Sequence, residues 1–231
     1  MASAVYDGKT LAAQHPRLAL PLGRVRGHGE IVDEGTDIVI ESFPRCASSF
    51  AVGAFRMAQE PATMRIANHT HMPAQVMVAA RRGIPALVLI REPQEAILSL
   101  LIRNPDLGVA AALRGFLRFF EPLTQYRAGF VVARFEEVIG DFGAVIVRVN
   151  ERFGTSFVPF RHSPENAERV ARDIEEDYRS RITSDEQLER IIPRPSDTRR
   201  HLKQDLRRRF AETAPDRLVA RAGAVYAELT G

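Results

Sequence analysis

A strand, a turn and the start of a helix are predicted within one short stretch of the chain, Ile38-Val-Ile-Glu-Ser-Phe-Pro-Arg-Cys-Ala-Ser-Ser-Phe50. The segment Thr36–Glu41 is short and rich in β-branched residues, which is typical of a buried strand. A turn that contains proline follows, and Ser48 or Ser49 can then cap a helix that ends before Pro61. A strand that continues through a turn into a helix is the repeating unit of α/β proteins.

The same succession continues toward the C-terminus. Strands are predicted over 63–68, 85–90 and 129–133, and helices up to Arg82, from Arg91-Glu-Pro93 onward, over 109–126 and over 142–153. The chain before about Gly35 is expected to be irregular, and the chain beyond Pro164 to be mostly helical, with breaks at Pro193, Pro195 and Pro215. Alternating strands and helices predict an α/β fold with a largely parallel sheet, which binds ligands at the carboxyl ends of its strands.

Length and composition fit one domain over residues 1–231. The mass is 25.8 kDa and 45% of the residues are apolar, which is enough for a sizeable core. A net charge of +3 and a pI of about 9.4 are compatible with binding of small anions as well as of nucleic acid. Because Lys9 and Lys203 are the only lysines, a phosphate site here must rely on bidentate contacts from arginine guanidinium groups.

The single cysteine and the hydropathy pattern bear on the compartment. Because Cys46 is the only cysteine, the chain cannot form an intrachain disulfide. No histidine lies next to Cys46 in the sequence, so we interpret it first as a small structural residue. The stretch up to Ala19 lacks the apolar run and basic start of a signal peptide. No segment reaches the roughly 18 apolar residues of a membrane span. We therefore expect a cytoplasmic protein without a membrane span.

The loop before the first long helix offers an anion site. A helix N-terminus presents free backbone N–H groups and a partial positive charge, which favour phosphate or sulfate. Arg45 adds a full charge, and Ser48 and Ser49 add hydroxyl donors. The loop is not a Walker A motif, because it lacks the glycines and the lysine. Taken alone, a capped helix without any ligand is an equally good interpretation.

Two further motifs also follow predicted strands. Arg91 ends one strand and Ser99 lies two turns into the next helix, so both can contact one phosphate; the alternative is a surface ion pair and a packing serine. His69-Thr-His-Met-Pro73 supplies histidine, the usual general base near neutral pH. No Cys, Asp or Glu beside it completes a zinc site, and a polar loop without chemistry is the alternative.

Taken together and in this order, the three motifs resemble the sulfotransferases that use 3′-phosphoadenosine 5′-phosphosulfate. Pro44-Arg-Cys-Ala-Ser-Ser-Phe50 is similar to their phosphosulfate loop, Pro-Lys-Ser/Thr-Gly-Thr-Thr/Ser followed by an aromatic residue. Arg91 and Ser99 match their Arg-x-Pro-x-x-x-x-x-Ser frame, and His69–Pro73 resembles their Lys-Thr-His-Leu-Pro segment. Ala133–Asp141 is similar to their Tyr-Glu-Asp-Leu segment. The resemblance covers about residues 36–155.

The resemblance implies a three-layer fold like that of P-loop NTPases, with a nucleotide-binding core over 36–155 and a helical C-terminal part over 160–231. It implies 3′-phosphoadenosine 5′-phosphosulfate as co-substrate, adenosine 3′,5′-bisphosphate as product, and no metal. It makes His71 the catalytic base and Arg45 the second catalytic residue. The residues it implies for donor binding are Arg45, Cys46, Ala47, Ser48 and Ser49 around the 5′ end, and Arg91 and Ser99 around the 3′-phosphate. Because the chain has no tryptophan, Phe50 is the candidate to stack on the adenine, and a buried core position is the alternative. The family's late Arg-Lys-Gly segment is not clearly present, and Arg199 and Arg200 are the candidates to replace it near the 3′-phosphate.

Two departures keep rival functions open. Arg45 stands where the family has lysine, and Ala47 where it has glycine. Arginine, with a pKa above about 12, stabilises charge but donates protons poorly, so turnover is expected to be slow unless this branch is adapted to arginine. The rivals are a small P-loop-type kinase and a nucleotide-binding relative that has lost catalysis.

The acceptor and other partners are less defined. A small molecule or carbohydrate with a hydroxyl or amine is expected, and the apolar stretch Val109–Leu123 either lines its cleft or belongs to the core. The segment from Arg190 to Arg221 contains ten Lys or Arg residues and four Asp or Glu residues, and its single aromatic residue, Phe210, does not make an interleaved pattern. A solvated helical face is therefore favoured over a nucleic-acid site. The oligomeric state is not indicated.

Overall fold

The structure is a computed structural model that describes residues 1–26, 30–184, 188, 191 and 197–231, with 26 and 197–199 described by their backbone only. Within these residues, four strands form one parallel sheet in the order β2-β1-β3-β4. The strands are β1 (Ile38–Ser42), β2 (Ile66–Asn68), β3 (Ala86–Ile90) and β4 (Val131–Arg134). Every residue of β1 and β3 is buried, as apolar strands in the middle of a parallel sheet should be.

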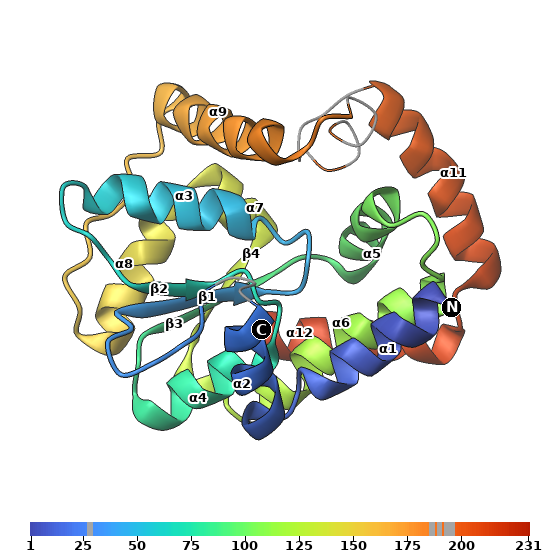
Figure 1. Ribbon diagram of the computed structural model, residues 1–231, viewed down its shortest axis with the longest axis horizontal. Helices are drawn as coiled ribbons and strands as arrows, with labels where there is room; N and C mark the ends of the chain where they lie inside the picture. The colour runs from blue at the N-terminus through green and yellow to red at the C-terminus, as the bar shows by residue number, and fades with distance from the viewer. Residues whose placement is uncertain (27–29, 185–187, 189–190, 192–196) are drawn as a thin grey trace.

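Helices cover both faces of this sheet (Figure 1). One face carries α3 (Ser48–Gln59), α7 (Phe135–Gly140) and α8 (Phe142–Phe153), with α9 (Pro164–Arg181) packed outside α3. The other face carries α4 (Pro73–Arg82), α6 (Val109–Thr124) and α12 (Asp216–Thr230), with α1 (Ala2–Ala12) and α2 (Pro16–Arg26) packed outside them. Next to the sheet, α5 (Pro93–Arg103) packs against α6 and against α11 (Asp197–Thr213). The predicted three-layer α/β fold with a helical C-terminal segment is confirmed.

Local sequence explains where the central helices begin and end. Pro73 and Pro93 occupy the first turns of α4 and α5, where a missing N–H costs nothing. Gly83 and Gly154 end α4 and α8 with φ angles of 68° and 66°, a left-handed conformation that glycine adopts without strain. These boundaries agree with those predicted from the sequence.

The helix α6 belongs to the core. Its apolar face is buried along its length, and the Phe116 ring lies 5.4 Å from that of Phe43, which directly follows β1. The Phe116 and Phe120 rings lie 4.6 Å apart. Of the two interpretations of Val109–Leu123, core packing is therefore the correct one. The contact also anchors the first residue of the loop between β1 and α3.

The prediction of an irregular N-terminus is wrong, because α1 and α2 are helices. Tertiary contacts explain this outcome. Asp7 of α1 forms ion pairs of 2.5 Å with both Arg114 and Arg118 of α6, and Ser3 Oγ accepts the N–H of Gly108 at 3.1 Å. Such contacts override the weak helix propensity that scattered glycine and proline gave this stretch.

The C-terminal prediction agrees with the described residues. Helices α9, α11 and α12 make up most of the chain beyond Pro164, and Pro215 separates α11 from α12. The breaks predicted at Pro193 and Pro195 lie outside the described residues. The short helix α7, which follows β4 directly, was not predicted.

Candidate anion-binding and catalytic site

The sheet topology places a switch point between β1 and β3. The chain leaves β1 toward α3 on one face, whereas it leaves β3 toward α5, which packs on α6 beside the opposite face. The loops at the carboxyl ends of these two neighbouring strands therefore diverge. Ligands of open α/β sheets bind at such a switch point. All the sequence motifs singled out above follow the carboxyl ends of β1, β2, β3 or β4.

The loop between β1 and α3 is held in a strained conformation. Arg45 and Ala47 have φ angles of 74° and 69°, in the left-handed region that costs a residue with a side chain about 1 kcal/mol. Cys46 between them is fully buried, and burial raises the pKa of its thiol to about 12. Cys46 therefore holds the loop to the core and is a poor nucleophile at neutral pH.

The N-terminus of α3 lacks a side-chain cap. Ala47 is the N-cap residue and forms no capping hydrogen bond, so the prediction that Ser48 or Ser49 caps the helix is wrong. Both serines lie inside the first turn because the left-handed Ala47 begins the helix one residue earlier. Ser48 is buried, and Ser49 Oγ lies 3.3 Å from His69 Nε2. The first-turn N–H groups of α3 thus lack a side-chain acceptor of the N-cap type.

Arg45 joins this loop to the second motif. Its Nε donates to Ser99 Oγ at 3.0 Å, and its Nη1 donates to the carbonyl of Ile191 at 3.0 Å. Arg91 Nη1 in turn lies 3.4 Å from the carbonyl oxygen of Arg45. The loop around Arg45 and the pair Arg91 and Ser99 therefore lie side by side, within reach of one small ligand.

Arg91 is held in place on two sides. Its guanidinium carbon lies 3.9 Å above the centre of the Phe135 ring, and its Nη2 lies 3.7 Å from the Glu95 carboxylate. Only 17% of the Arg91 side chain is exposed, and its Nε has no hydrogen-bond partner among the described residues. A buried guanidinium N–H without an acceptor is costly, and a bond to an anionic group would remove that cost.

Glu95 connects this arginine to α11. Its carboxylate accepts hydrogen bonds from Lys203 and from Arg207, the latter at 2.9 Å. Burial raises the pKa of Glu95, but these two hydrogen bonds, together with the positive charges of Lys203 and Arg91, keep the pKa below its usual value. The sequence analysis missed Glu95 and Arg207. The only available signal was the rarity of lysine, which made Lys203 conspicuous.

The predicted residues Arg199 and Arg200 also lie on α11. The side chain of Arg199 is outside the described residues, and that of Arg200 is exposed. Lys203 and Arg207 of α11 both bond Glu95 in the first turn of α5. A role for Arg199 and Arg200 at the 3′-phosphate stays a prediction.

Phe50 lies in an aromatic cluster on α3. Its ring centre is 6.1 Å from that of Phe160 and 5.7 Å from that of His162. Phe50 is partly buried. Stacking on adenine stays a prediction, and packing against Phe160 is the contact that the structure describes.

The histidine loop after β2 is organised by a buried carboxylate. Glu41 of β1 is completely buried, and its carboxylate accepts the backbone N–H groups of Thr70 at 2.9 Å and of His71 at 3.1 Å. The Thr70 hydroxyl and the Gln75 amide also donate to it, at 2.6 and 2.9 Å. Burial raises the pKa of Glu41, against the effect of these donors. These bonds fix a loop in which His69 and His71 have φ angles of 58° and 52°.

His71 is presented as a neutral base. Its Nδ1 lies 2.8 Å from the carbonyl oxygen of Ser42, which can only accept, so Nδ1 carries the proton and Nε2 keeps its lone pair. The pKa of His71 is lowered to about 4, mainly by burial and also by the charges of Arg103, Lys9 and Arg45, against the opposing effect of the Ser42 carbonyl. At neutral pH the ring is uncharged and Nε2 can accept a proton.

His69 has a different environment. Its Nε2 is the atom that meets Ser49 Oγ, and its Nδ1 is hydrogen-bonded to the Asn68 side chain. Burial lowers the pKa of His69, and the neighbouring His71 adds to this effect. Both ring nitrogens of His69 are thus engaged, whereas the Nε2 of His71 has no hydrogen bond within the described part of the chain. Of the two histidines, His71 is the one suited to proton abstraction.

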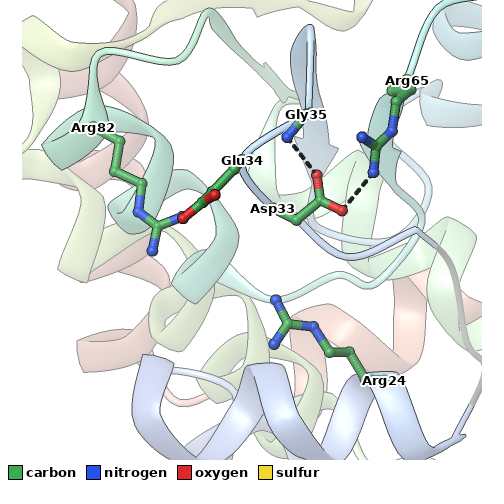
Figure 2. Close-up of a pocket in the computed structure, with 6 residues that line it drawn as sticks. All are labelled: Arg24, Asp33, Glu34, Gly35, Arg65 and Arg82. Carbon is green, nitrogen blue, oxygen red and sulfur yellow. Dashed lines mark hydrogen bonds and ion pairs between the residues drawn. The ribbon is translucent and has the colours of Figure 1, made fainter.

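A hollow lies at the opposite edge of the sheet. Its volume is about 440 Å³, and residues that precede β1 and β2 line it, together with Arg24 and Arg82 (Figure 2). Asp33 there pairs with Arg65 at 2.5 Å and accepts the N–H of Gly35 at 2.9 Å. These charges are exposed and satisfy one another, and the sequence motifs lie at the other edge.

Within the described part of the chain, no group of three or more His, Cys, Asp or Glu side chains could hold a metal ion. Nor does any helix there combine the length and apolar character needed to cross a bilayer.

The geometry thus defines an α/β protein with a strained, arginine-bearing loop and a neutral histidine at one topological switch point. No protein-family model matches the sequence, and no curated protein matches it. Among solved structures, mouse sulfotransferase SULT7A1 complexed with PAP is similar, with a TM-score of 0.45 and 15% identity over 85% of this chain and 90% of that chain. Similarity at this level carries no argument about what this chain binds.

Proposed function

We propose that this chain is a sulfotransferase that moves a sulfuryl group from 3′-phosphoadenosine 5′-phosphosulfate to a hydroxyl or amine. The observation that carries the proposal is the direct contact between the two predicted anion sites, Arg45 Nε to Ser99 Oγ at 3.0 Å, at the switch point of the sheet. A nucleotide with anionic groups at both its 5′ and 3′ positions needs two such sites side by side. ADP and AMP carry no phosphate at the 3′ position.

In this proposal the donor is bound by two groups of residues. The first-turn N–H groups of α3, together with Arg45 and Ser49, hold the 5′-phosphosulfate. Arg91 and Ser99 hold the 3′-phosphate, and the unpartnered Nε of Arg91 gains an acceptor. The existing bond between Arg45 and Ser99 is then exchanged for bonds to the donor.

The chemical step is an in-line transfer. The acceptor oxygen or nitrogen forms a bond to sulfur while the bond between sulfur and the bridging phosphate oxygen breaks, and His71 Nε2 takes the acceptor proton. Adenosine 3′,5′-bisphosphate leaves with its new negative charge beside Arg45. Arginine stabilises that charge without donating a proton, because its pKa is above about 12.

Calorimetry with adenosine 3′,5′-bisphosphate, ADP and AMP tests the donor assignment. We expect the bisphosphate to bind at least about tenfold more tightly than AMP, which corresponds to one charge-assisted hydrogen-bonding group. Arg91→Ala should remove most of this preference, whereas Arg65→Ala, at the opposite edge of the sheet, should leave it unchanged. Equal affinity for all three nucleotides would contradict the proposal, and tighter binding of ATP with Mg²⁺ would favour a kinase.

A second candidate is a nucleotide-binding relative that has lost catalysis. The observation that favours it is the engagement of the Arg45 side chain with both Ser99 and the Ile191 carbonyl. Preference for the bisphosphate, without sulfation of any member of a broad acceptor panel, would support this candidate. Turnover restored by Arg45→Lys would show that the arginine is the cause.

A further inference from the structure

The outer sides of α1 and α2 carry most of the large apolar side chains that the described part of the chain exposes. Ten such side chains are exposed, and six of them lie within residues 1–25, which are about one tenth of the sequence: Met1, Val5, Leu11, Leu18, Leu22 and Val25. Single exposed apolar residues are normal on a protein surface, whereas a concentration of them marks an interaction surface.

Helix α2 turns its larger apolar side chains outward. Leu18, Leu22 and Val25 follow one another at helical spacing, and they are 57%, 46% and 86% exposed. The side that packs inward includes two small residues, Ala19 and Gly23, which are buried. A surface helix usually places its apolar stripe against the core. The outward stripe of α2 therefore needs a partner beyond the described residues.

Close packing fixes α2 in this orientation. A Cβ added at Gly23 would lie 2.7 Å from Ile31 Cδ1 and 2.9 Å from Met72 Cε, so a rotation that turned Leu22 inward would break this contact. Helix α2 packs on α4 and α1 packs on α6, and the two helices form the outermost layer on one face of the sheet (Figure 1). Their outer sides therefore face away from the sheet together.

The charges of this outer layer are positive. Residues 8–29 include four Lys or Arg residues and no Asp or Glu, and the acid that precedes them is already paired with two arginines of α6. Lys9 and Arg17 are exposed and form no ion pair within the described part of the chain. Arg24 instead points to the hollow of Figure 2 and donates to the Val32 carbonyl at 3.3 Å. The layer thus combines an apolar stripe with two cations that lack a counter-charge.

An anionic bilayer matches both properties of this layer. It offers negative headgroups to the two cations and an apolar boundary region, just below the headgroups, to the stripe. A second copy of the chain fits less well. In a two-fold contact the same face meets itself, so like charges would be brought together. Since residues 8–29 hold no acid, nothing in that stretch would compensate them.

We propose that the outer sides of α1 and α2 dock on the surface of an anionic phospholipid membrane. Leu18, Leu22 and Val25 enter the boundary between headgroups and acyl chains, while Lys9 and Arg17 pair with lipid phosphates. The contact is peripheral, because the helices lie on the bilayer and do not cross it. This inference goes beyond the proposed function and does not depend on the donor.

Co-sedimentation of the full chain with lipid vesicles tests the proposal. One set of vesicles contains phosphatidylcholine alone, and the other contains equal parts of phosphatidylcholine and phosphatidylglycerol. We expect binding to the anionic vesicles to be at least about tenfold tighter, because each of the two cations gains about fivefold near a negative surface. The difference should shrink as salt is added. Equal binding to both kinds of vesicle, or binding to neither, would overturn the proposal.

Matched double variants assign the binding to the apolar stripe. Leu18→Gln combined with Leu22→Gln should weaken binding to the anionic vesicles at least about tenfold. Val147→Gln combined with Val158→Gln changes positions of similar exposure, 40% and 54%, on the α3 side of the sheet and should leave binding unchanged. All four side chains are exposed, so both proteins are expected to fold, which circular dichroism checks. Parent-like binding by the leucine variant would show that the stripe does not dock.

Single charge variants and the mass of the free chain complete the test. Lys9→Gln and Arg17→Gln should each weaken vesicle binding about fivefold, whereas Arg172→Gln, an exposed arginine of α9, should not. Equal effects of all three would contradict docking through α1 and α2. Light scattering without vesicles should give the same mass for the parent chain and the leucine variant. A parent dimer that the leucine variant separates into monomers would mean that a second copy covers this face and that the proposal is wrong.

Discussion

The two edges of the sheet differ in how their polar groups are held. At the carboxyl edge, Glu41 is completely buried with donors on both carboxylate oxygens. At the amino edge, Asp33 and Arg65 form an ion pair with both side chains more than 40% exposed. The four non-glycine residues with positive φ in the described part of the chain, Arg45, Ala47, His69 and His71, all lie at the carboxyl edge.

This contrast shows which features identify a site. The amino edge has a hollow of about 440 Å³, yet its charges are solvated and its turns are unstrained. Strained backbone and buried charge are costly, and they persist where the surrounding structure holds them in place. We therefore place the functional site at the carboxyl edge. The hollow at the amino edge is not taken as a functional site on the basis of its volume. Matched variants at the two edges test this contrast.

The largest expected effect is on turnover. His71→Ala removes the proton acceptor and should lower kcat by about 10²–10⁴-fold while affinity for adenosine 3′,5′-bisphosphate survives. Arg65→Ala, at the amino edge, should leave kcat unchanged. Steady-state sulfation and calorimetry measure the two quantities. Unchanged turnover in the His71 variant would remove it from the role of base.

The next effect is on stability. Glu41→Ala leaves several buried donors without an acceptor and should lower the free energy of unfolding by about 3 kcal/mol. Asp33→Ala, its amino-edge counterpart, should change stability little because its charges remain in contact with water. Urea denaturation midpoints give both values. Equal losses in the two variants would mean that burial of Glu41 does not distinguish the edges.

A smaller effect is on the pH dependence of stability. The pKa of His71 is about 4 in the folded chain, below its ordinary value of 6.5, so between these values the unfolded state binds more protons. The stability from neutral His71 is complete above pH 6.5 and is lost as pH falls toward 4. His71→Gln should therefore flatten the stability curve across this window.

Asp33 provides the matching control. The N–H of Gly35 is the main cause that lowers the pKa of Asp33 below 3.8. Its contribution is present above pH 3.8 and is lost only at lower pH. Thermal melts of His71→Gln and Asp33→Asn should thus depart from the parent chain in different pH ranges. A departure of both in the same range would contradict the assignment to His71.

The sequence was sufficient for most of the fold. Short apolar strands, prolines in first turns and Gly83 and Gly154 at helix ends are local signals, and the strands and central helices followed them. The N-terminal helices could not be predicted in this way. They depend on Asp7 meeting two arginines more than a hundred residues away.

The candidate site likewise has a part that the sequence predicts and a part that it does not. Strand ends brought Arg45, Arg91 and His71 to one edge, as parallel topology requires. The residues that support them were not predictable from the sequence. Glu41 has the local sequence of an ordinary strand residue and Glu95 that of an exposed helix residue, and only their tertiary contacts distinguish them. The two serines were predicted as caps, but the left-handed Ala47 takes the N-cap position instead.

The smallest expected effect concerns that alanine. Ala47 has a φ of 69°, where its Cβ costs about 1 kcal/mol, and glycine would remove this strain while it increases the entropy of the unfolded chain. Ala47→Gly should therefore raise the free energy of unfolding by less than about 1 kcal/mol. Ala51→Gly, in the right-handed interior of the same helix, should lower it by about 1 kcal/mol. Opposite signs in the two urea midpoints would establish that the strain lies in the loop, and a loss of stability in both would show that Ala47 is not strained.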